Sequence, residues 1–415
     1  MPSHSFLPLR GLTGSRGVDP LAGRVTQVLE GNPRGEFVLY HARAARRVTN
    51  NLALQFARTL GHDVVMAEWL DEPHLTPRTE AYLRAGARRN AEEAERQGTR
   101  YLFEPDRELI ERARFVVTDE FPTLPVPSYA THLVDGNGLL PMRAMPKEQY
   151  SAKFFRDRAH RLFEQYYFRP ETPAVAAQSG SPRAALEAFV SERLPGYATM
   201  RNKSPGHVSG LSPALHFGHI GIHEITAHVL DSTAPAEDID SFLEEAVIRR
   251  ELSFNMCFFN PAWGSLKALP EWALRTLDKH REDRRKPRYS YEELEQAKTY
   301  DSVWNLAQRQ LLACGTIHGY LRMLWGKKII EWSDTPEEAH AAMVRMHDVY
   351  ALDGRDPNTH AGILWCFGKH DRPWAPERPI FGSIRWMSSE QTAKKVRLRE
   401  IEAVVEAAER GEMER

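Results

Sequence analysis

Phe37-Val-Leu-Tyr40 is the first of three short apolar runs that decide the fold of the N-terminal half. Val64-Val-Met66 and Phe115-Val-Val-Thr118 follow it, and all three are rich in the β-branched and aromatic residues that strands favour. Two helical stretches separate them, Asn50 to Leu60 and the charged segment from Thr79 to Gln97. Because strands that alternate with helices form parallel sheets, we predict an α/β domain of the Rossmann-like type.

The second half of the chain carries helix signals instead. Asp240-Ser-Phe-Leu-Glu244 has the pattern of a capping box, in which Ser241 and Glu244 satisfy each other's backbone amides. Asp301 is a candidate N-cap, and Thr335-Pro336 places Thr at an N-cap and Pro in the first turn. We therefore predict an all-α domain after the α/β domain.

The length of 415 residues is too great for one core, so several segments are expected. The stretch from Pro170 to Pro182 has no periodicity and is typical of a surface linker. The predicted segments are a loose N-terminal tail (1–34), the α/β domain (35–150), a linker (151–185), the helical domain (186–405) and a C-terminal tail (406–415).

Composition limits the possible partners. The 55 Lys and Arg residues balance 56 Asp and Glu, so a nucleic-acid surface has to be a local patch. Three distant cysteines argue against a disulfide framework or an iron–sulfur cluster, and a reducing cytosol fits them best. No apolar run has the length of a membrane span. We expect a cytoplasmic monomer that does not bind a membrane.

The motif Leu211-Ser-Pro-Ala-Leu-His-Phe-Gly218 predicts a helix that starts at Ser212-Pro213, after a segment with small hydroxyls. Free backbone amides at such a start can bind a diphosphate. A capped structural helix is the alternative interpretation.

Glu245 and Arg249, in Glu244-Glu-Ala-Val-Ile-Arg-Arg-Glu251, are four residues apart and share a helix face. A surface ion pair is the simplest interpretation. Because aromatic residues follow directly, a carboxylate beside an apolar cleft is the alternative, and such a group can bind a base.

Two further patterns fit either packing or redox chemistry. Trp325 and Trp332 are two helical turns apart, and Trp304 lies on the preceding helix; core packing is the ordinary role of such residues. The turn Leu352-Asp-Gly-Arg-Asp-Pro-Asn358 is typical of an Asx turn, although Asp353 can also bind a polar ligand.

His219 and His223 have the i,i+4 spacing of two metal ligands on a helix. The sequence offers no obvious third ligand near them, and His216 belongs to the Leu-Ser-Pro motif. We therefore predict no metal site.

Together these segments resemble a class II cyclobutane pyrimidine dimer (CPD) photolyase of the photolyase/cryptochrome family. The resemblance runs from about Ser209 to Arg399 through the motifs above, through His318-Gly-Tyr-Leu-Arg-Met-Leu-Trp325, and to Glu377-Arg-Pro-Ile-Phe-Gly-Ser-Ile-Arg-Trp-Met387. The N-terminal half matches mainly at Arg47-Val-Thr-Asn-Asn and Glu148-Gln-Tyr-Ser-Ala-Lys153.

The resemblance implies a DNA-repair enzyme, a deoxyribodipyrimidine photo-lyase that binds FAD in the helical domain. Excited reduced FAD would give an electron to a dimer flipped out of UV-damaged DNA. The implied FAD contacts are Tyr197, Ser209, Leu211 and Ser212 at the phosphates, and Arg322, Asp353 and His347 near the ring. The implied electron relay is Trp325, Trp304 and Trp332, with Trp325 nearest the flavin.

The same resemblance implies two sets of DNA contacts. Glu245, Met323 and Trp365 match residues that contact the lesion, and Arg372 and Trp374 match residues that fill the gap it leaves. Residues 361–400 hold eight basic and four acidic residues, a patch of net +4 suited to phosphates. We count Arg249, Arg378 and Arg385 among the expected DNA contacts.

Three positions depart from the family pattern. His347 replaces an Asn near flavin N5, and we expect it to titrate near neutral pH and change which flavin redox state is stable. Ala214 replaces a Tyr in the Leu-Ser-Pro motif. The α/β domain is short before Phe115, which argues against a second, deazaflavin antenna chromophore.

Two other functions stay open. Repair of the (6-4) photoproduct depends on a His near the flavin in related proteins, and His347 is a candidate for that role. A cryptochrome-like light sensor would bind flavin without repair, but it would have no need of the lesion contacts Glu245, Met323, Trp365, Arg372 and Trp374. CPD repair is therefore the preferred prediction.

Overall fold

A computed structural model describes residues 5–11, 17–171 and 177–412. Parts of the predicted N-terminal tail (1–4 and 12–16), linker (172–176) and C-terminal tail (413–415) lie outside the described residues. The chain forms two compact units. Unit 1 consists of residues 1–149, 153–195 and 209–255, and unit 2 of residues 150–152, 196–208 and 256–415. The segment predicted as one helical domain, 186–405, is thus shared between the two units.

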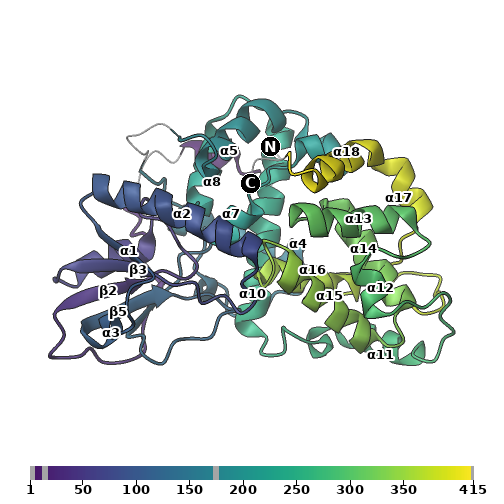
Figure 1. Cartoon of the computed structure of the whole chain (residues 1–415), viewed down its shortest axis with the longest axis horizontal. Helices are drawn as coiled ribbons and strands as arrows, with labels where there is room; N and C mark the ends of the chain where they lie inside the picture. Colours follow the sequence, from purple (N-terminus) through teal and green to yellow (C-terminus); the bar gives the residue numbers. More distant parts are fainter. Residues whose placement is uncertain (1–4, 12–16, 172–176, 413–415) are drawn as a thin grey trace. The chain divides into compact units, whose positions relative to one another are not determined.

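Unit 1 contains a six-stranded sheet with the strand order β1-β6-β5-β2-β3-β4 (Figure 1). Its strands are β1 (Val25–Gln27), β2 (Phe37–His41), β3 (Val64–Glu68), β4 (Arg100–Phe103), β5 (Ala113–Asp119) and β6 (His132–Val134). All neighbouring strands are parallel except β1, which pairs with β6 in the antiparallel sense. The predicted parallel α/β sheet is confirmed.

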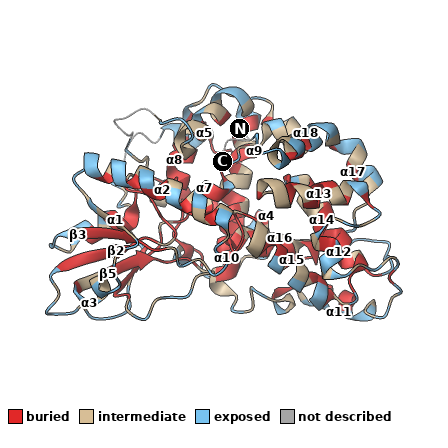
Figure 2. Ribbon diagram, in the orientation of Figure 1, coloured by how far each residue is buried: buried red, intermediate tan, exposed pale blue. Residues whose placement is uncertain are grey.

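The strands alternate their side chains between two apolar layers. Val38, Tyr40 and Met66 pack with helix α1 on one face, and Leu39 and Val65 pack on the other face, against α3. Figure 2 shows that β2 and β5 are buried along much of their length. Burial on both faces explains why the strand sequences are continuous apolar runs.

The other elements of unit 1 are mainly helical. They are η1 (Leu7–Gly11), α1 (Leu52–Thr59), α2 (Pro77–Arg96), α3 (Glu108–Glu111), η2 (Met142–Ala144), α4 (Ala152–Tyr166), α5 (Pro182–Ala188), the π-helical turn η3 (Phe189–Arg193), α7 (Ser212–His216), α8 (Ile222–Asp231), α9 (Ala236–Leu243) and the π-helical turn η5 (Glu244–Arg249). Helix α10 (Arg250–Phe259) runs across the boundary between the units.

Three predictions for unit 1 are wrong. The predicted linker, 151–185, contains helix α4 and the start of α5. Residues 25–27, predicted as part of a loose tail, form the edge strand β1. The capping box of Ser241 and Glu244 does not form, because α9 already begins at Ala236. The Glu244 carboxylate instead accepts two hydrogen bonds from Arg156, 88 residues away in the sequence. The neighbouring Asp240 accepts hydrogen bonds from the Phe6 amide and the Ser5 hydroxyl, 2.8 and 3.2 Å away.

Unit 2 is helical throughout its regular structure. Its elements are α6 (Tyr197–Met200), η4 (Pro205–His207), η6 (Leu266–Ala268), α11 (Glu271–Lys279), α12 (Tyr291–Glu295), α13 (Ser302–Cys314), α14 (Gly319–Trp332), α15 (Pro336–Tyr350), α16 (Pro357–Cys366), α17 (Ser389–Lys395) and α18 (Leu398–Glu409). The predicted caps are confirmed, since Asp301 accepts from the Val303 and Trp304 amides and Thr335 accepts from Glu338. None of the helices in the described part of the chain has the length and apolarity of a membrane span.

Candidate functional site

Three tryptophans form a continuous aromatic chain inside unit 2. Trp304 on α13 lies parallel to Trp325 on α14, with an interplanar angle of 2° and 6.5 Å between the ring centroids. The other neighbour of Trp304 is Trp332, at 5.4 Å and 69°. All three rings are buried. The structure thus brings together the predicted relay residues in the predicted order, with Trp304 between the two tryptophans of α14.

Hydrogen bonds fix the first two rings of this chain. The Trp304 indole N–H donates to the Trp325 carbonyl at 3.0 Å, and the Trp325 indole N–H donates to Gln308 Oε1 at 2.8 Å. Each ring therefore has one orientation, as closely spaced redox partners require.

His347 lies next to Trp325, at one end of the chain of tryptophans. Its ring is perpendicular to that of Trp325, at 88° with a centroid separation of 5.0 Å. His347 is only 2% exposed, its Nδ1 lies 2.9 Å from the Met343 carbonyl oxygen, and Nε2 has no hydrogen-bond partner among the described residues. Burial, with a smaller contribution from Arg322, lowers the pKa of His347 to about 4. The prediction that His347 titrates near neutral pH is wrong, because the ring is removed from water.

Arg322 and Asp353 form the predicted salt bridge. Their closest nitrogen and oxygen atoms are 3.4 Å apart, and the Asp353 carboxylate is buried whereas the Arg322 side chain is one quarter exposed. The Nε of Arg322 is buried without a hydrogen-bond partner in the part of the chain that the structure describes. Backbone packing is tight here, because a Cβ on Gly354 would lie 2.4 Å from the His347 carbonyl oxygen.

The predicted phosphate contacts belong to different units. Ser209, Leu211 and Ser212 lie in unit 1, whereas Tyr197 lies buried at the start of α6 in unit 2. Helix α7 begins at Ser212, as predicted, but no side chain caps it, and the Ser209 hydroxyl accepts from the Leu211 amide at 3.3 Å. The backbone amides at this start therefore stay available for an anion.

Glu245 and Arg249 form the expected i,i+4 ion pair at 3.1 Å, on the π-helical turn η5. Both side chains are about one third exposed. Arg249 also lies 3.8 Å from Glu244, which accepts two hydrogen bonds from Arg156. The expected surface ion pair is thus present, and the Glu245 side chain is partly exposed. π-helical turns of this kind are frequent at functional sites.

Met323 and Trp365, the other predicted lesion contacts, are both half-buried residues of unit 2. Met323 on α14 packs against the core of the unit. Trp365 near the end of α16 makes an edge contact with His370, at 67° and 5.8 Å. Both keep apolar surface at the protein exterior.

The segment after α16 carries the predicted DNA contacts. Two guanidinium groups, those of Arg372 and Arg385, lie over the Trp374 ring, each 5.0 Å from its centroid. Arg378 lies over a different ring, Trp386, at 4.1 Å. The three arginines are exposed, so the basic patch expected from the sequence is present on one short segment.

His219 and His223, whose spacing is that of two metal ligands on a helix, do not lie on one helix. His219 precedes α8, which begins at Ile222, so His219 and His223 do not share a helix face. His219 instead stacks on Tyr82, and His223 stacks on Phe168 with its Nδ1 3.1 Å from the Phe168 carbonyl oxygen. Over the described residues, no group of three or more candidate metal ligands occurs.

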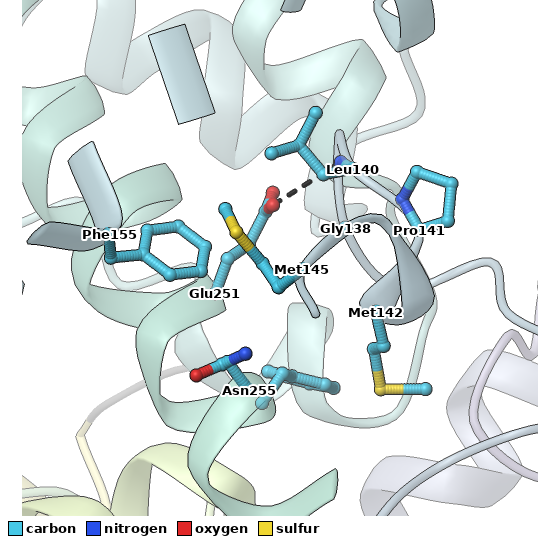
Figure 3. Close-up of a pocket in the computed structure, with 9 residues that line it drawn as sticks. Gly138, Leu140, Pro141, Met142, Met145, Phe155, Glu251 and Asn255 are labelled. Atoms are coloured by element: carbon cyan, nitrogen blue, oxygen red, sulfur yellow. Dashed lines mark hydrogen bonds between the residues drawn. The ribbon is translucent and has the colours of Figure 1, made fainter. Parts of the chain in front are cut away.

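Sequence reasoning missed Glu251, the last residue of the Glu244–Glu251 motif. Its buried carboxylate accepts the amides of Leu139 and Leu140, at 2.6 and 3.3 Å, and borders a cavity of about 20 Å³ (Figure 3). That volume suits about one water molecule. Burial raises the pKa of Glu251 to about 7. The signal in the sequence is the position of Glu251 one helical turn before Phe254, on the same side of the helix as the apolar residues that follow.

Comparison with known proteins gives clear relatives, although no family model matches the chain. A deoxyribodipyrimidine photo-lyase from Methanothermobacter thermautotrophicus is 33% identical over 422 residues, which cover 88% of this chain and 94% of that protein. Proteins of the same name from Oryza sativa subsp. japonica and Potorous tridactylus are 38% and 41% identical over 307 and 227 residues. These matches cover 63% and 54% of this chain, and the chain spans only 60% and 42% of those two relatives.

Solved structures show the same fold. A class III photolyase from Agrobacterium tumefaciens superposes with a TM-score of 0.66 at 18% identity, over 88% of this chain and 85% of that one. A cryptochrome from Synechocystis superposes with a TM-score of 0.66 at 13% identity, over 86% of each chain. At such identities the likeness establishes the fold: a mainly parallel sheet followed by helices.

Proposed function

Because this chain belongs to the photolyase/cryptochrome family, we propose that it is an FAD-dependent DNA-repair enzyme. Its sequence relatives are deoxyribodipyrimidine photo-lyases. The proposed reaction is the light-driven repair of cyclobutane pyrimidine dimers, and the proposed class is class II. The observation that carries the proposal is the buried chain from Trp325 through Trp304 to Trp332. His347 contacts the Trp325 end of this chain and lies near the salt bridge of Arg322 and Asp353.

The residues around His347 fit a bound flavin. A flavin ring offers several hydrogen-bond acceptors and one donor, and His347 Nε2 and Arg322 Nε are buried nitrogens with no hydrogen-bond partner among the described residues. An unsatisfied buried polar group is costly, so a ligand that satisfies both nitrogens stabilises the site. We propose that Arg322, Asp353 and His347, all in unit 2, hold the ring.

When bound, FAD would supply the light-driven electron chemistry, and the protein would supply position and environment. Arg322 would place a cation near the ring and favour negative charge there, although its partner Asp353 offsets part of that effect. The relay would return electrons to the site through fixed, water-free contacts. Burial of all three indoles keeps that path free of solvent.

The lesion contacts would act on a flipped dimer. A dimer inside a stacked duplex is out of reach of a buried cofactor, so it has to leave the duplex. Met323 and Trp365 would offer apolar surface for its rings, and Glu245, oriented by Arg249, would donate or accept a hydrogen bond at the carbonyl edge. Arg372 and Trp374 would fill the gap in the duplex, and Arg378 and Arg385 would contact phosphates.

The decisive test is repair under controlled light. The purified protein is illuminated with oligonucleotides that contain either a CPD or a (6-4) photoproduct, with matched dark samples as controls. We expect bound FAD in the absorption spectrum and light-dependent restoration of the CPD substrate alone. Restoration of only the (6-4) substrate would support the alternative based on His347. Bound flavin with repair of neither substrate would support a light sensor.

A further inference from the structure

The segment from Arg372 to Trp386 is a hairpin with two exposed tryptophans. Arg378 and Gly382 exchange backbone hydrogen bonds of 3.0 and 2.7 Å, and the Trp374 amide donates to the Ser383 carbonyl at 2.8 Å. Trp374 is 36% exposed and Trp386 is 38% exposed, although both are large apolar residues. Two such residues on one short hairpin indicate a binding surface.

Each tryptophan of the hairpin is covered by arginine on part of its ring. Arg372 and Arg385 lie over Trp374, and Arg378 lies 4.1 Å from the centroid of Trp386. In the described parts of the chain, no carboxylate lies within ion-pair distance of these three guanidinium groups. Their charge is therefore not neutralised within the protein and remains available to phosphates.

The acidic residues of the hairpin have other partners. Glu377 pairs with Lys279 at 2.6 Å. Asp371 accepts from the Arg372 amide at 2.8 Å and from the Trp374 indole N–H at 3.3 Å. The contact from Asp371, which directly precedes the hairpin, orients the Trp374 ring.

Trp386 has the features of a stacking platform. A guanidinium on one part of an indole leaves the remaining aromatic surface free for a second flat group, and bases stack on such rings without regard to sequence. Arg385 and Trp386 are adjacent in the chain, and Arg385 packs on Trp374. The platform therefore lies next to the side chain that we place in the gap of the duplex.

We infer that Trp386, backed by Arg378, stacks on an unpaired base of the undamaged strand, opposite the lesion. The inference rests on the proposed function. A dimer joins two adjacent bases, so its removal from the duplex leaves two bases of the other strand without partners. An insertion of Trp374 fills the space of the dimer, and the neighbouring Trp386 meets one of the bases that lost its partner.

The test measures affinity in the dark for three DNAs: a duplex with one CPD, the single strand with the same CPD, and the undamaged duplex. Trp386→Leu removes the aromatic face, Trp386→Phe keeps one, and Arg378→Gln removes the backing cation. Tyr300→Leu is the control, because Tyr300 is an exposed aromatic residue that lies outside the hairpin. Circular dichroism verifies that each variant is folded.

We expect Trp386→Leu to weaken binding to the CPD duplex by about tenfold and to leave binding to the CPD single strand unchanged. Trp386→Phe should keep most of the affinity, Arg378→Gln should lose part of it, and Tyr300→Leu should equal the wild type. A 2-aminopurine placed opposite the CPD should be quenched by the wild type and not by Trp386→Leu.

Two results would overturn the inference and leave the proposed function intact. One is an unchanged affinity of Trp386→Leu for the CPD duplex. The other is an equal loss of affinity for the CPD duplex and the CPD single strand, which would place Trp386 on the damaged strand. If the wild type does not prefer the CPD duplex to undamaged duplex, the proposed function itself fails, and the inference fails with it. The three DNAs therefore separate the two failures.

Discussion

The ring of His347 meets the ring of Trp325 edge to face, at 88° and 5.0 Å, inside the core of unit 2. The contact joins the residue that departs from the family pattern to the first residue of the proposed relay. It also excludes water from His347. The groups that act on the protonation of His347 are Arg322, Asp353 and His360.

His347→Asn should leave the pH dependence of the flavin-dependent properties between pH 5.5 and 7.5 unchanged, because a pKa of about 4 keeps His347 neutral there. The histidine pKa is lower in the folded state than in the unfolded state, about 6.5, so the unfolded state binds more protons between those values. The variant should therefore lose less stability than the wild type when the pH falls from 6.5 to 4. Urea unfolding at both pH values measures the difference, and a titration of His347 near pH 6.5 by NMR would contradict the expectation.

Trp325→Phe should slow photoreduction of bound oxidised flavin, because the first member of the relay becomes harder to oxidise. CPD repair by protein that has been reduced chemically should survive, since repair does not draw on the relay. Transient absorption after a laser flash measures the first effect. Trp272→Phe is the matched control, because Trp272 does not contact the three relay rings. Equal photoreduction in both variants would remove Trp325 from the relay.

Arg385→Gln should reduce the salt dependence of binding to CPD duplex. Each phosphate contact contributes about 0.9 to the slope of log affinity against log salt concentration, so the slope should fall by about one. Fluorescence anisotropy over a salt series gives the slope. Arg275→Gln is the control, because Arg275 is exposed but paired with Glu271. A slope that does not change would show that Arg385 contacts no phosphate.

Glu251→Gln should change how stability depends on pH. The pKa of Glu251, about 7 in the folded protein, exceeds that of an exposed Glu, so the folded state holds the proton more tightly. The stability from this proton is present at pH 4 and is lost as the pH rises to 7, which amounts to about 3 kcal/mol. Chemical unfolding at pH 5 and pH 8 should show a smaller loss in the variant. Glu390→Gln, at an exposed position, should behave as the wild type.

Asp301→Ala should destabilise the helix that carries Trp304. Asp301 accepts the amides of Val303 and Trp304 at 3.1 Å, and loss of such a cap costs about 1 kcal/mol. Asp301→Asn keeps a capping oxygen and should keep most of the stability. Thermal unfolding compares the two variants, and equal melting temperatures for Asp301→Ala and the wild type would show that the cap contributes nothing.

Local sequence patterns predicted the central sheet and the helical second half, because both depend on local periodicity. Strands β1, β4 and β6 were not predicted; they have only three or four residues, and neighbouring strands rather than their own sequences define them. The false capping box of Ser241 and Glu244 has the same origin, since the true partner of the Glu244 carboxylate is the distant Arg156.

For the site, the two-turn spacing of Trp325 and Trp332 placed both on one helix, and family resemblance supplied the order of the relay. The pKa of His347 was not predictable from sequence, because burial by distant segments sets it. The pairing of Arg378 with Trp386 was also hidden, since it depends on the hairpin that turns between Arg378 and Gly382.

Helix α11 and the turn after it hold the hairpin of Arg372 to Trp386 in place. Thr276 Oγ1 accepts the Ser383 amide at 2.9 Å, and the Asp283 carboxylate accepts the Ile380 amide at 2.7 Å. These bonds exist before DNA arrives, so little conformational entropy has to be lost when the tryptophans enter the duplex. Recognition of damage would then be limited by the opening of the DNA and not by the ordering of the protein. The weakness of a damaged base pair, more than any motion of the hairpin, would set how fast the lesion is found.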